Sequence, residues 1–234
     1  MNKVLNAIDR IRLENTILEV CKSIGHNLAM DIYRTEYSLR KELVACILGS
    51  QVRYEMASKA LDRMEKAGLL TDEWWNRIDD EFESEVYKAL SNDSFSNLGV
   101  GCYRFSKIRA NQLQKTRNSI VDESLWEILY SACNAKLKRK ILINRITGIG
   151  PKQASMFLRN VGMSYDLAIL DTHVLDFMVI QNVLCEDQLN ISTLVSYERI
   201  ECIVKDYSDF LGYPVGYLDW AIWATMKAAK EMKA

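Results

Sequence analysis

The sequence predicts an all-α protein arranged as two helical lobes. Only two of its 234 residues are proline and ten are glycine, so long helices meet few breakers. Apolar residues recur at helical spacing along most of the chain, and no useful length of it alternates as a strand would. A chain that is 49% hydrophobic and 26% charged can bury a sizeable core. This length suits one large domain or two smaller lobes that share a cleft.

The first lobe is predicted to span residues 1–100, and the C-terminal helices can complete it. We expect helices within residues 1–37 and at residues 38–50, 55–67 and 71–90. Ser38 is placed to cap the second of these helices, and Gly68 to end the third. Residues 91–102 are rich in serine and glycine, which predicts a loop between the lobes.

Residues 101–234 are predicted to form the second lobe, which carries the chemistry. The expected helices lie at 106–120, 124–132 and 135–145, then from Pro151 onward, and at 172–183, 197–211 and 215–232. Residues 184–197 are expected to form a loop with a short helix.

Basic residues are concentrated in the middle of the chain, although the net charge is only −1. Residues 100–160 hold twelve Lys and Arg residues and three acidic residues, so this segment carries +9 and the rest −10. A basic face on an acidic body suits phosphate binding. A solvated helical surface with a chance excess of basic residues explains the charge equally well. The basic residues are Arg104, Lys107, Arg109, Lys115, Arg117, Lys136, Lys138, Arg139, Lys140, Arg145, Lys152 and Arg159.

The cysteines predict isolated, reduced thiols rather than a metal centre. None of the six forms a C-x-x-C pair, and none has zinc-site spacing to histidine. The first residues lack the apolar run of a signal peptide, and nowhere are there about 18 consecutive apolar residues that could span a membrane. We therefore expect a cytoplasmic protein with no membrane partner and no metal. The cysteines are Cys21, Cys46, Cys102, Cys133, Cys185 and Cys202.

A glycine turn between two helices predicts a hairpin that binds a DNA phosphate. Gly148 and Gly150 allow positive φ and close approach, and Pro151 suits the first position of the following helix. Free backbone amides at such a turn can bind an anion without reading sequence. We expect Arg145 to contribute to this phosphate contact. Backbone carbonyls of the turn can also hold a monovalent cation.

Lys152 follows directly and is a candidate nucleophile. The positive end of the helix dipole disfavours its charged form, and a lysine with a lowered pKa can form a Schiff base. The alternative is a simple phosphate contact.

Asp171 ends an apolar run and precedes a helix, so it can be an ordinary N-cap. A carboxylate that also faced the substrate could stabilise an oxocarbenium-like sugar or move a proton. His173 could donate to a phosphate, although a lone histidine there is more often an ordinary surface residue.

The string GIGPKQAS, followed by DLAILDTH, resembles the helix–hairpin–helix DNA glycosylases with a Gly/Pro-rich loop and an Asp. The resemblance is closest to the 8-oxoguanine DNA glycosylase/lyases of the second, archaeal and bacterial, type. It covers about residues 40–230, with gaps, and implies that the hairpin lies at the cleft between the lobes. The absence of iron–sulfur cysteines argues against the endonuclease III branch, and Lys152 against the monofunctional branches. These second-type enzymes tend to end on a lysine, whereas this sequence ends on Ala234.

Further site residues follow from the same resemblance. The corner after residue 50 carries Gln51 and Arg53, and Gln51 takes the place of the family residue that fills the gap left by the extruded nucleotide. By itself this corner would be read as an ordinary connection between two helices. In the last helix, Asp219 and Trp223 fall where the family contacts the base edge and stacks on the base. The alternative is a local partner for Asp219 and a core position for Trp223.

The implied function is a bifunctional glycosylase/lyase that flips an oxidised purine, with 8-oxoguanine in first place, out of double-stranded DNA. Asp171 would assist base loss, and Lys152 would form the Schiff base that permits β-elimination. No redox cofactor or divalent metal is expected, and the protein is expected to be a monomer. The alternatives are a glycosylase for another modified base, an inactive helix–hairpin–helix DNA-binding module, and a helical scaffold with no role in nucleic-acid binding.

Overall fold

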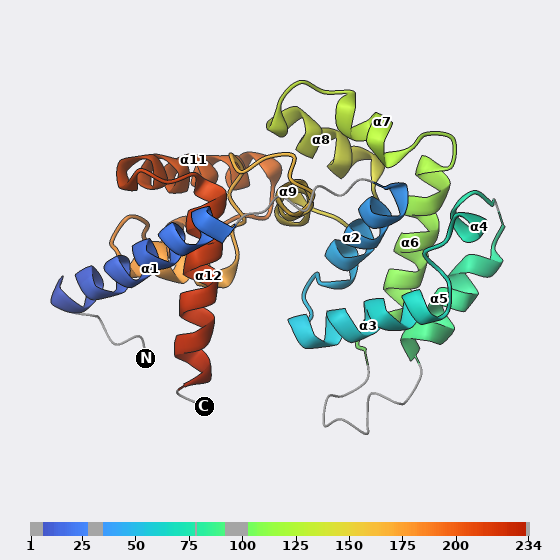
Figure 1. The fold of residues 1–234 in the computed structure, drawn as a ribbon, viewed down its shortest axis with the longest axis horizontal. Coiled ribbons are helices and arrows are strands. Elements are labelled where there is room, and N and C mark those ends of the chain that lie inside the picture. Colours follow the sequence, from blue (N-terminus) through green and yellow to red (C-terminus); the bar gives the residue numbers. More distant parts are fainter. Residues whose placement is uncertain (1–6, 28–34, 78, 92–102, 233–234) are drawn as a thin grey trace. The chain divides into compact units, whose positions relative to one another are not determined.

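The computed structural model describes residues 7–27, 35–77, 79–91 and 103–232, and every regular element among them is a helix. Figure 1 shows these helices in order along the chain. The chain divides into two compact units. Unit 1 combines residues 1–31 with 162–234, and unit 2 is residues 32–161. None of the helices in the described ranges is both long and apolar enough to cross a membrane.

Unit 1 forms because the first helix packs against the last. Its elements are α1 (Ala7–Asn27), α10 (Thr172–Ile180), the short 3₁₀ helix η2 (Glu186–Gln188), α11 (Leu194–Leu211) and α12 (Val215–Glu231). Ile17 and Cys21 of α1 are fully buried in a cluster with apolar residues of α10, α11 and α12. Removing such side chains from water is the main favourable term in folding. This burial assigns α1 to the C-terminal helices (Figure 1).

The observed division therefore differs from the boundary predicted at residue 100. That boundary and the predicted loop at 91–102 lie outside the described residues, apart from position 91, which ends α5. The amphipathic pattern of the first helix predicts that it packs on something, but it cannot name the partner.

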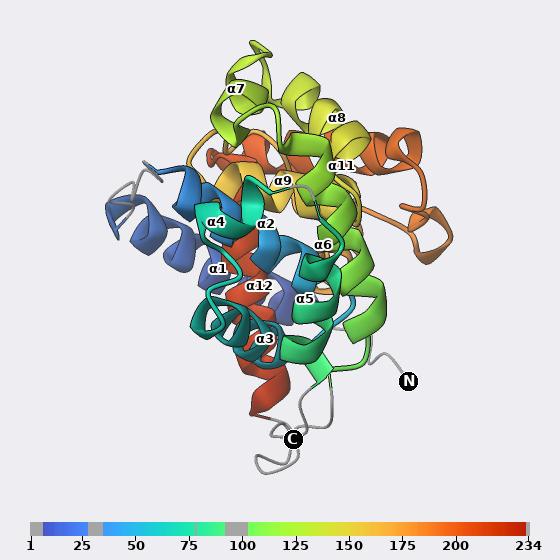
Figure 2. The ribbon, with the colours of Figure 1, turned by 90° about the vertical axis from the view of Figure 1, so that its right-hand side faces the viewer.

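Unit 2 is built around α2 (Glu36–Leu48), which packs against α3, α6, α7 and α9 (Figure 2). Seven residues of α2 are buried, so this helix faces neighbours on most sides. The other elements of the unit are α3 (Tyr54–Lys66), α4 (Asp72–Trp75), α5 (Glu81–Ser91), α6 (Ser106–Ile120), α7 (Leu125–Tyr130), α8 (Ala135–Arg145) and α9 (Pro151–Asn160).

The predicted cap of α2 is wrong by three residues. Thr35, rather than Ser38, is the N-cap, and its hydroxyl accepts the Ser38 amide at 3.1 Å. The Ser38 hydroxyl in turn accepts the Thr35 amide at 3.2 Å, which completes a reciprocal capping box. Two side chains three residues apart therefore bond each other's backbone amides, and the helix begins after the first of them. Gly68, with φ +71°, follows the end of α3 as predicted, and α2 ends at Leu48 with Gly49 as its C-cap.

The single helix predicted over residues 71–90 is also wrong, because it is divided into α4 and α5. Asp79 starts the second helix: its Oδ1 accepts the amides of Glu81 at 3.1 Å and Phe82 at 3.3 Å. A short acidic side chain that bonds nearby amides competes with continued helix, and here it begins a new one.

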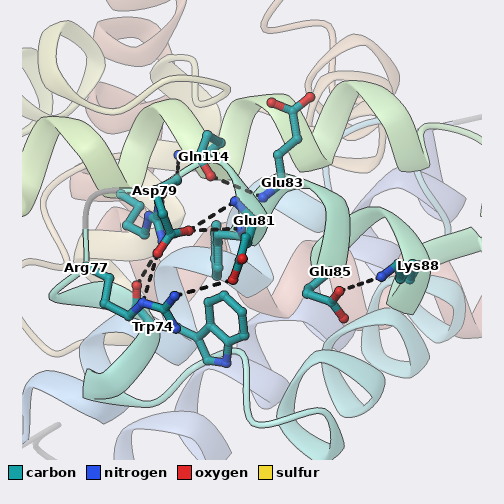
Figure 3. A network of polar contacts seen from close by, with 10 residues as sticks. Trp74, Arg77, Asp79, Glu81, Glu83, Glu85, Lys88 and Gln114 are labelled. Atoms are coloured by element: carbon teal, nitrogen blue, oxygen red, sulfur yellow. Dashed lines mark hydrogen bonds and ion pairs between the residues drawn. The ribbon is translucent and has the colours of Figure 1, made fainter.

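A buried arginine of α6 contacts the backbone at the break between α4 and α5. The Arg117 side chain is fully buried and donates to the Trp74 carbonyl at 3.0 Å and to the Asp79 carbonyl. Gln114, one turn earlier, donates to the same Asp79 carbonyl at 2.8 Å and accepts the Glu83 amide at 3.1 Å. Figure 3 shows this network around Asp79. The backbone groups left free by the break are therefore satisfied by α6 side chains.

We predict that Asp79→Asn lowers the melting temperature at neutral pH and that the difference shrinks below about pH 4. Burial works against ionisation of Asp79, but Arg117, Arg77 and two backbone amides together lower its pKa from the ordinary 3.8. Because the pKa of Asp79 is lower in the folded protein than in the unfolded chain, its carboxylate stabilises the fold at any pH above the pKa of the unfolded state. This stabilisation is lost as the pH falls through the pKa of the folded state. Asparagine keeps the capping geometry, so the variant isolates the charge.

Thermal unfolding followed by circular dichroism from pH 7 to pH 3 measures the effect. Glu81→Gln is the matched control, because the Glu81 side chain is 72% exposed and its ion pair with Arg77 should contribute little. A difference for Asp79→Asn that stays constant with pH would contradict the prediction.

Candidate active site

The predicted hairpin is present in unit 2 as α8, a turn and α9. Asn134 caps α8, which ends at Arg145, and residues 146–150 form the turn. Ile146 and Ile149 bury their side chains in it, with 2% and 7% exposed. The turn is therefore anchored by apolar contacts, while its backbone connects the two helices.

Side chains of α6 brace the start of this turn. The Thr116 hydroxyl donates to the Thr147 carbonyl at 3.0 Å, and the Ser119 hydroxyl donates to the Arg145 carbonyl at 2.8 Å. The last carbonyls of a helix lack partners within it, so the Ser119 bond satisfies the end of α8, and the Thr116 bond satisfies a carbonyl of the turn itself. The end of α8 is thereby tied to α6.

The two glycines of the turn differ in what they require. Gly148 has φ +96°, which other residues rarely adopt, whereas Gly150 has φ −107°, an extended value open to any residue. A Cβ on Gly148 would lie 2.7 Å from Cδ of Gln112. A Cβ on Gly150 would meet nothing closer than 3.6 Å. The expected positive φ is thus confirmed at Gly148 and wrong at Gly150.

Lys152 stands at the second position of α9, directly after Pro151 at the first. Proline suits that position because it has no amide hydrogen to leave unsatisfied. Among the residues that the structure describes, the Lys152 side chain has no hydrogen-bond or ion-pair partner, and it is partly exposed. The amine is therefore not tied to any carboxylate in the described ranges and can meet a substrate group.

The predicted anion site at the hairpin is only partly open. The Gly150 amide donates to Oε1 of Gln153 at 3.3 Å, so this group already has a partner. A phosphate that used this amide would have to displace the Gln153 side chain. Arg145 is likewise engaged, through an ion pair with Glu123.

The basic face is smaller than the charge count suggests. Three of the twelve basic residues between positions 100 and 160, Arg109, Arg117 and Arg139, are at most 6% exposed. They bond carbonyls and side chains inside unit 2, as Arg139 does with the Ser155 hydroxyl at 3.2 Å. Buried charges of this kind brace the fold and do not meet phosphates.

The corner between α2 and α3 presents the predicted gap-filling residues to solvent. Gln51 and Arg53 are both exposed. Gln51 has φ +60°, a left-handed conformation that is uncommon outside glycine. Strain of this kind persists only where the surroundings enforce it, and it is frequent at functional sites. An ordinary connection between two helices does not need a non-glycine residue in a left-handed conformation.

In unit 1, the backbone that leads to Asp171 is held by buried side chains. The amides of residues 168–170 donate in order to Glu201 at 3.1 Å, Asp219 at 2.8 Å and the Tyr197 hydroxyl at 3.1 Å. The Tyr197 hydroxyl also donates to the Ala168 carbonyl at 2.7 Å. An extended run without a neighbouring strand needs such partners. Helices α11 and α12 thus determine where Asp171 lies within unit 1.

Asp171 is the N-cap of α10, as its local alternative predicts. Its Oδ1 accepts the Val174 amide at 2.8 Å. Within the described part of the chain, Oδ2 has no hydrogen-bond partner, so one oxygen can serve chemistry while the other serves the cap. His173 lies in the first turn of the same helix, and its buried Nδ1 also lacks a partner among these residues.

Asp219 and Trp223 share one face of α12, but they differ in exposure. Asp219 is 1% exposed and bonds the Ile169 amide, a partner 50 residues away in place of the local one that the alternative predicts. Trp223 is partly exposed, and the Lys227 ammonium lies 5.1 Å from its ring centre. The aromatic surface predicted for base stacking is therefore accessible, whereas the carboxylate already holds the run before Asp171.

The site residues fall into two sets. Gln51, Arg53, Arg145, Gly148, Gly150 and Lys152 belong to unit 2, and Asp171, His173, Asp219 and Trp223 belong to unit 1. The structure brings Asp219 together with the run that precedes Asp171. It also connects the Gln51 corner to the Gly148 turn, as described below.

A family model described as 8-oxoguanine DNA glycosylase matches residues 27–213, which is most of the chain. The chain belongs to the 8-oxoguanine DNA glycosylase family. A relative named 8-oxoguanine DNA glycosylase/AP lyase, from Sulfurisphaera tokodaii, is 34% identical over 194 residues. That match covers 78% of this chain and 79% of the relative.

Solved glycosylases share the fold. The crystal structure of 8-oxoguanine DNA glycosylase from Methanocaldococcus jannaschii is 25% identical, with a TM-score of 0.69, and covers 93% of this chain and 94% of its own. A second structure of that organism's 8-oxoguanine glycosylase/lyase, in complex with a 15mer DNA containing 8-oxoguanine, is 27% identical with a TM-score of 0.62. It covers 93% of this chain and 90% of its own. The all-α, helix–hairpin–helix prediction is confirmed.

In this glycosylase, sequence reasoning missed the residues that position the site. Arg109 and Gln112 in α6, and Tyr197 and Glu201 in α11, bond the backbone or side chains around it. The sequence signal for Tyr197 and Glu201 is their spacing, because residues four apart lie on one face of a helix and can contact the same segment. A buried Arg109 looks the same in the sequence as a surface arginine.

We predict that Gly148→Ala destabilises the glycosylase, whereas Gly150→Ala leaves its melting temperature nearly unchanged. A left-handed conformation costs a residue with a Cβ about 1–2 kcal/mol, and the clash with Gln112 adds to this. At Gly150 neither penalty applies. Thermal unfolding of the two matched variants checks the prediction, and equal melting temperatures for both would show that the left-handed turn is not needed.

Proposed function

We propose that this member of the family is a bifunctional DNA glycosylase and AP lyase that excises 8-oxoguanine from double-stranded DNA. The observation that carries the proposal is Lys152, an amine without a partner in the described residues, directly after the glycine turn. The names of the relatives support the substrate and both activities. The target base is flipped out first, because its glycosidic bond is inaccessible inside the stack.

Lys152 acts as the nucleophile. Its neutral amine attacks C1′, and the bond from C1′ to the base breaks with its electron pair leaving on the base, which takes up a proton. The lysine nitrogen loses a proton, and the sugar ring opens as the C1′–O4′ bond breaks and O4′ takes up a proton, which gives a Schiff base between C1′ and the lysine. Loss of a proton from C2′ then lets the C3′–O bond break, so the strand on the 3′ side leaves with the phosphate as its 5′ end. Water finally hydrolyses the Schiff base and frees the lysine.

Asp171 supports these steps through the oxygen that does not cap α10. A carboxylate stabilises the positive charge that develops on the sugar as the base departs. It can also accept a proton from the lysine ammonium and return one later. The cap bond to Val174 holds the carboxylate in one orientation, which favours both roles.

No redox cofactor or divalent metal is needed for this chemistry, because every step transfers only protons and electron pairs. A monovalent cation at the hairpin carbonyls stays a prediction. The Thr147 carbonyl accepts the Thr116 hydroxyl, and a carbonyl has a second lone pair that an ion can use.

The DNA contacts are assigned as follows. Gln51, with Arg53 beside it, fills the gap in the duplex, and its exposure and left-handed backbone support this role. The hairpin turn, Arg145 and His173 contact the DNA backbone, which requires Arg145 to leave Glu123. Trp223 stacks on the extruded base. A contact of Asp219 with the base edge requires this buried carboxylate, which holds the Ile169 amide, to become accessible. The protein acts as a monomer in the cytoplasm, at the nucleoid.

We predict that borohydride traps a covalent adduct between the protein and a duplex containing 8-oxoguanine, and that Lys152→Gln abolishes it. Reduction converts the Schiff base into a stable amine, so the adduct is visible on a denaturing gel. Lys136→Gln is the matched control, because Lys136 is also the second residue of its helix, α8, and is exposed. An adduct that persists in Lys152→Gln would remove that lysine from the nucleophile role. DNA binding without any adduct, on any modified base, would favour the inactive binding module.

We predict that Asp171→Asn keeps the melting temperature but slows single-turnover base release by about 10²–10⁴-fold. Asparagine caps a helix as well as aspartate does, so only the charge is lost. Asp171→Ala loses the cap too and should cost about 0.5–2 kcal/mol of stability in addition.

Thr193→Ala is the control for this pair, since it removes the cap of α11 in the same unit without touching the proposed chemistry. It should lower stability and leave the rate unchanged. If Asp171→Asn released the base at the wild-type rate, Asp171 would be a structural cap only.

A further inference from the structure

A buried arginine links the gap-filling corner to the hairpin turn. Arg109 of α6 is 6% exposed. Its Nη2 donates to the Ser50 carbonyl at 2.6 Å, and its Nη1 donates to Oε1 of Gln112 at 2.6 Å. Both bonds lie inside unit 2. One planar guanidinium therefore spans two features that are remote in the sequence.

On the corner side, the peptide that Arg109 holds comes directly before Gln51. A second bond holds the carbonyl of Leu48, which accepts the Tyr103 hydroxyl at 2.7 Å. Tyr103 is buried, and the loss of water raises its pKa to about 12 despite the nearby Arg109 charge, so it stays a neutral donor. With two carbonyls bonded, the backbone before Gln51 has little freedom to relax from φ +60°.

On the hairpin side, Gln112 is the intermediary. Its side chain fills the space beside Gly148, where an added Cβ would lie 2.8 Å from the same Oε1 that accepts Arg109. The Arg109 bond directs this amide toward the turn. Gln112 therefore cannot move away from Gly148 without breaking the bond to Arg109.

We propose that Arg109 is a positioning residue that keeps the Gln51 corner and the Gly148 turn in one arrangement for engaging the duplex. The inference rests on the proposed function, because it assigns a task to the gap-filling residue of a glycosylase. Arg109 does not touch DNA itself, since it is buried. It acts through the Ser50 carbonyl and through Gln112.

The chemistry of the side chain supports a positioning role. Arginine presents its donors in a rigid plane, so it can bridge two acceptors in fixed directions, whereas a lysine ammonium is a compact point charge on a flexible stem.

The test uses the full-length protein with Arg109→Lys, which keeps the charge and loses the bridge. Hydrogen–deuterium exchange should show faster amide exchange at residues 49–53 and 146–150. On a duplex with 8-oxoguanine, the single-turnover rate of base release should fall about tenfold to hundredfold, as expected for a misplaced group. Cleavage of a preformed abasic site in single-stranded DNA should be unchanged, because no duplex gap needs filling there.

Arg117→Lys is the matched control. Arg117 is also buried in α6, but it bonds Trp74 and Asp79 at the other end of unit 2. It should lower the melting temperature without changing exchange at residues 49–53 or the preference for duplex over single-stranded substrate. If Arg117→Lys and Arg109→Lys reduced duplex activity equally, the effect would be general destabilisation and the proposal would fall.

A double-mutant cycle with Gln51→Ala decides whether Arg109 acts through the corner. If it does, Arg109→Lys adds little to the loss already caused by Gln51→Ala. Independent, multiplying losses would overturn the proposal, as would unchanged exchange in both segments. The exchange measurement needs no catalysis, so it separates this proposal from the proposed function: an inactive wild-type protein would refute the latter alone.

Discussion

The left-handed turn at Gly148 is the constraint on which the hairpin depends. The chain must pass from the end of α8 to the start of α9 within five residues, and one of them must take φ +96°. The space beside it is filled by Gln112, so the turn can be neither widened nor given a side chain cheaply. Pro151 then begins α9, and Lys152 follows it, with no side-chain partner in the part of the chain that the structure describes. The place of the proposed nucleophile is thus a consequence of backbone geometry.

In unit 1, the position of Asp171 depends on the hydrogen bonds of the extended run before it. The extended run before it has no neighbouring strand, yet three consecutive amides are buried and must be satisfied. Glu201, Asp219 and Tyr197 do so from helices that come later in the chain. Both units therefore use buried polar side chains to hold irregular backbone next to a proposed functional group. Such networks specify one arrangement when every member has a partner.

Charge is used in two ways that the sequence does not separate. Some arginines of the basic segment, residues 100–160, are buried in unit 2. These are Arg109, Arg117 and Arg139, which bond backbone or side-chain oxygens. Others remain on its surface, where they can meet phosphates. Carboxylates also differ, since Asp219 is buried against a backbone amide while one oxygen of Asp171 has no partner among the described residues. A count of charges therefore overstates the surface available for DNA.

The sequence by itself determined the features whose causes lie within a few residues. These are the all-helical fold, the hairpin, Pro151 and Lys152 at the first positions of α9, and Asp171 as a cap. Only the tertiary structure decided the rest: the pairing of the first helix with the last, the α6 side chains that satisfy the backbone at the break near Asp79, and the placing of Arg109, Glu201 and Asp219. The physical reason is the separation in sequence over which each interaction acts. Helix caps, proline and glycine act on adjacent backbone, whereas the burial of a polar side chain depends on partners 30 to 60 residues away.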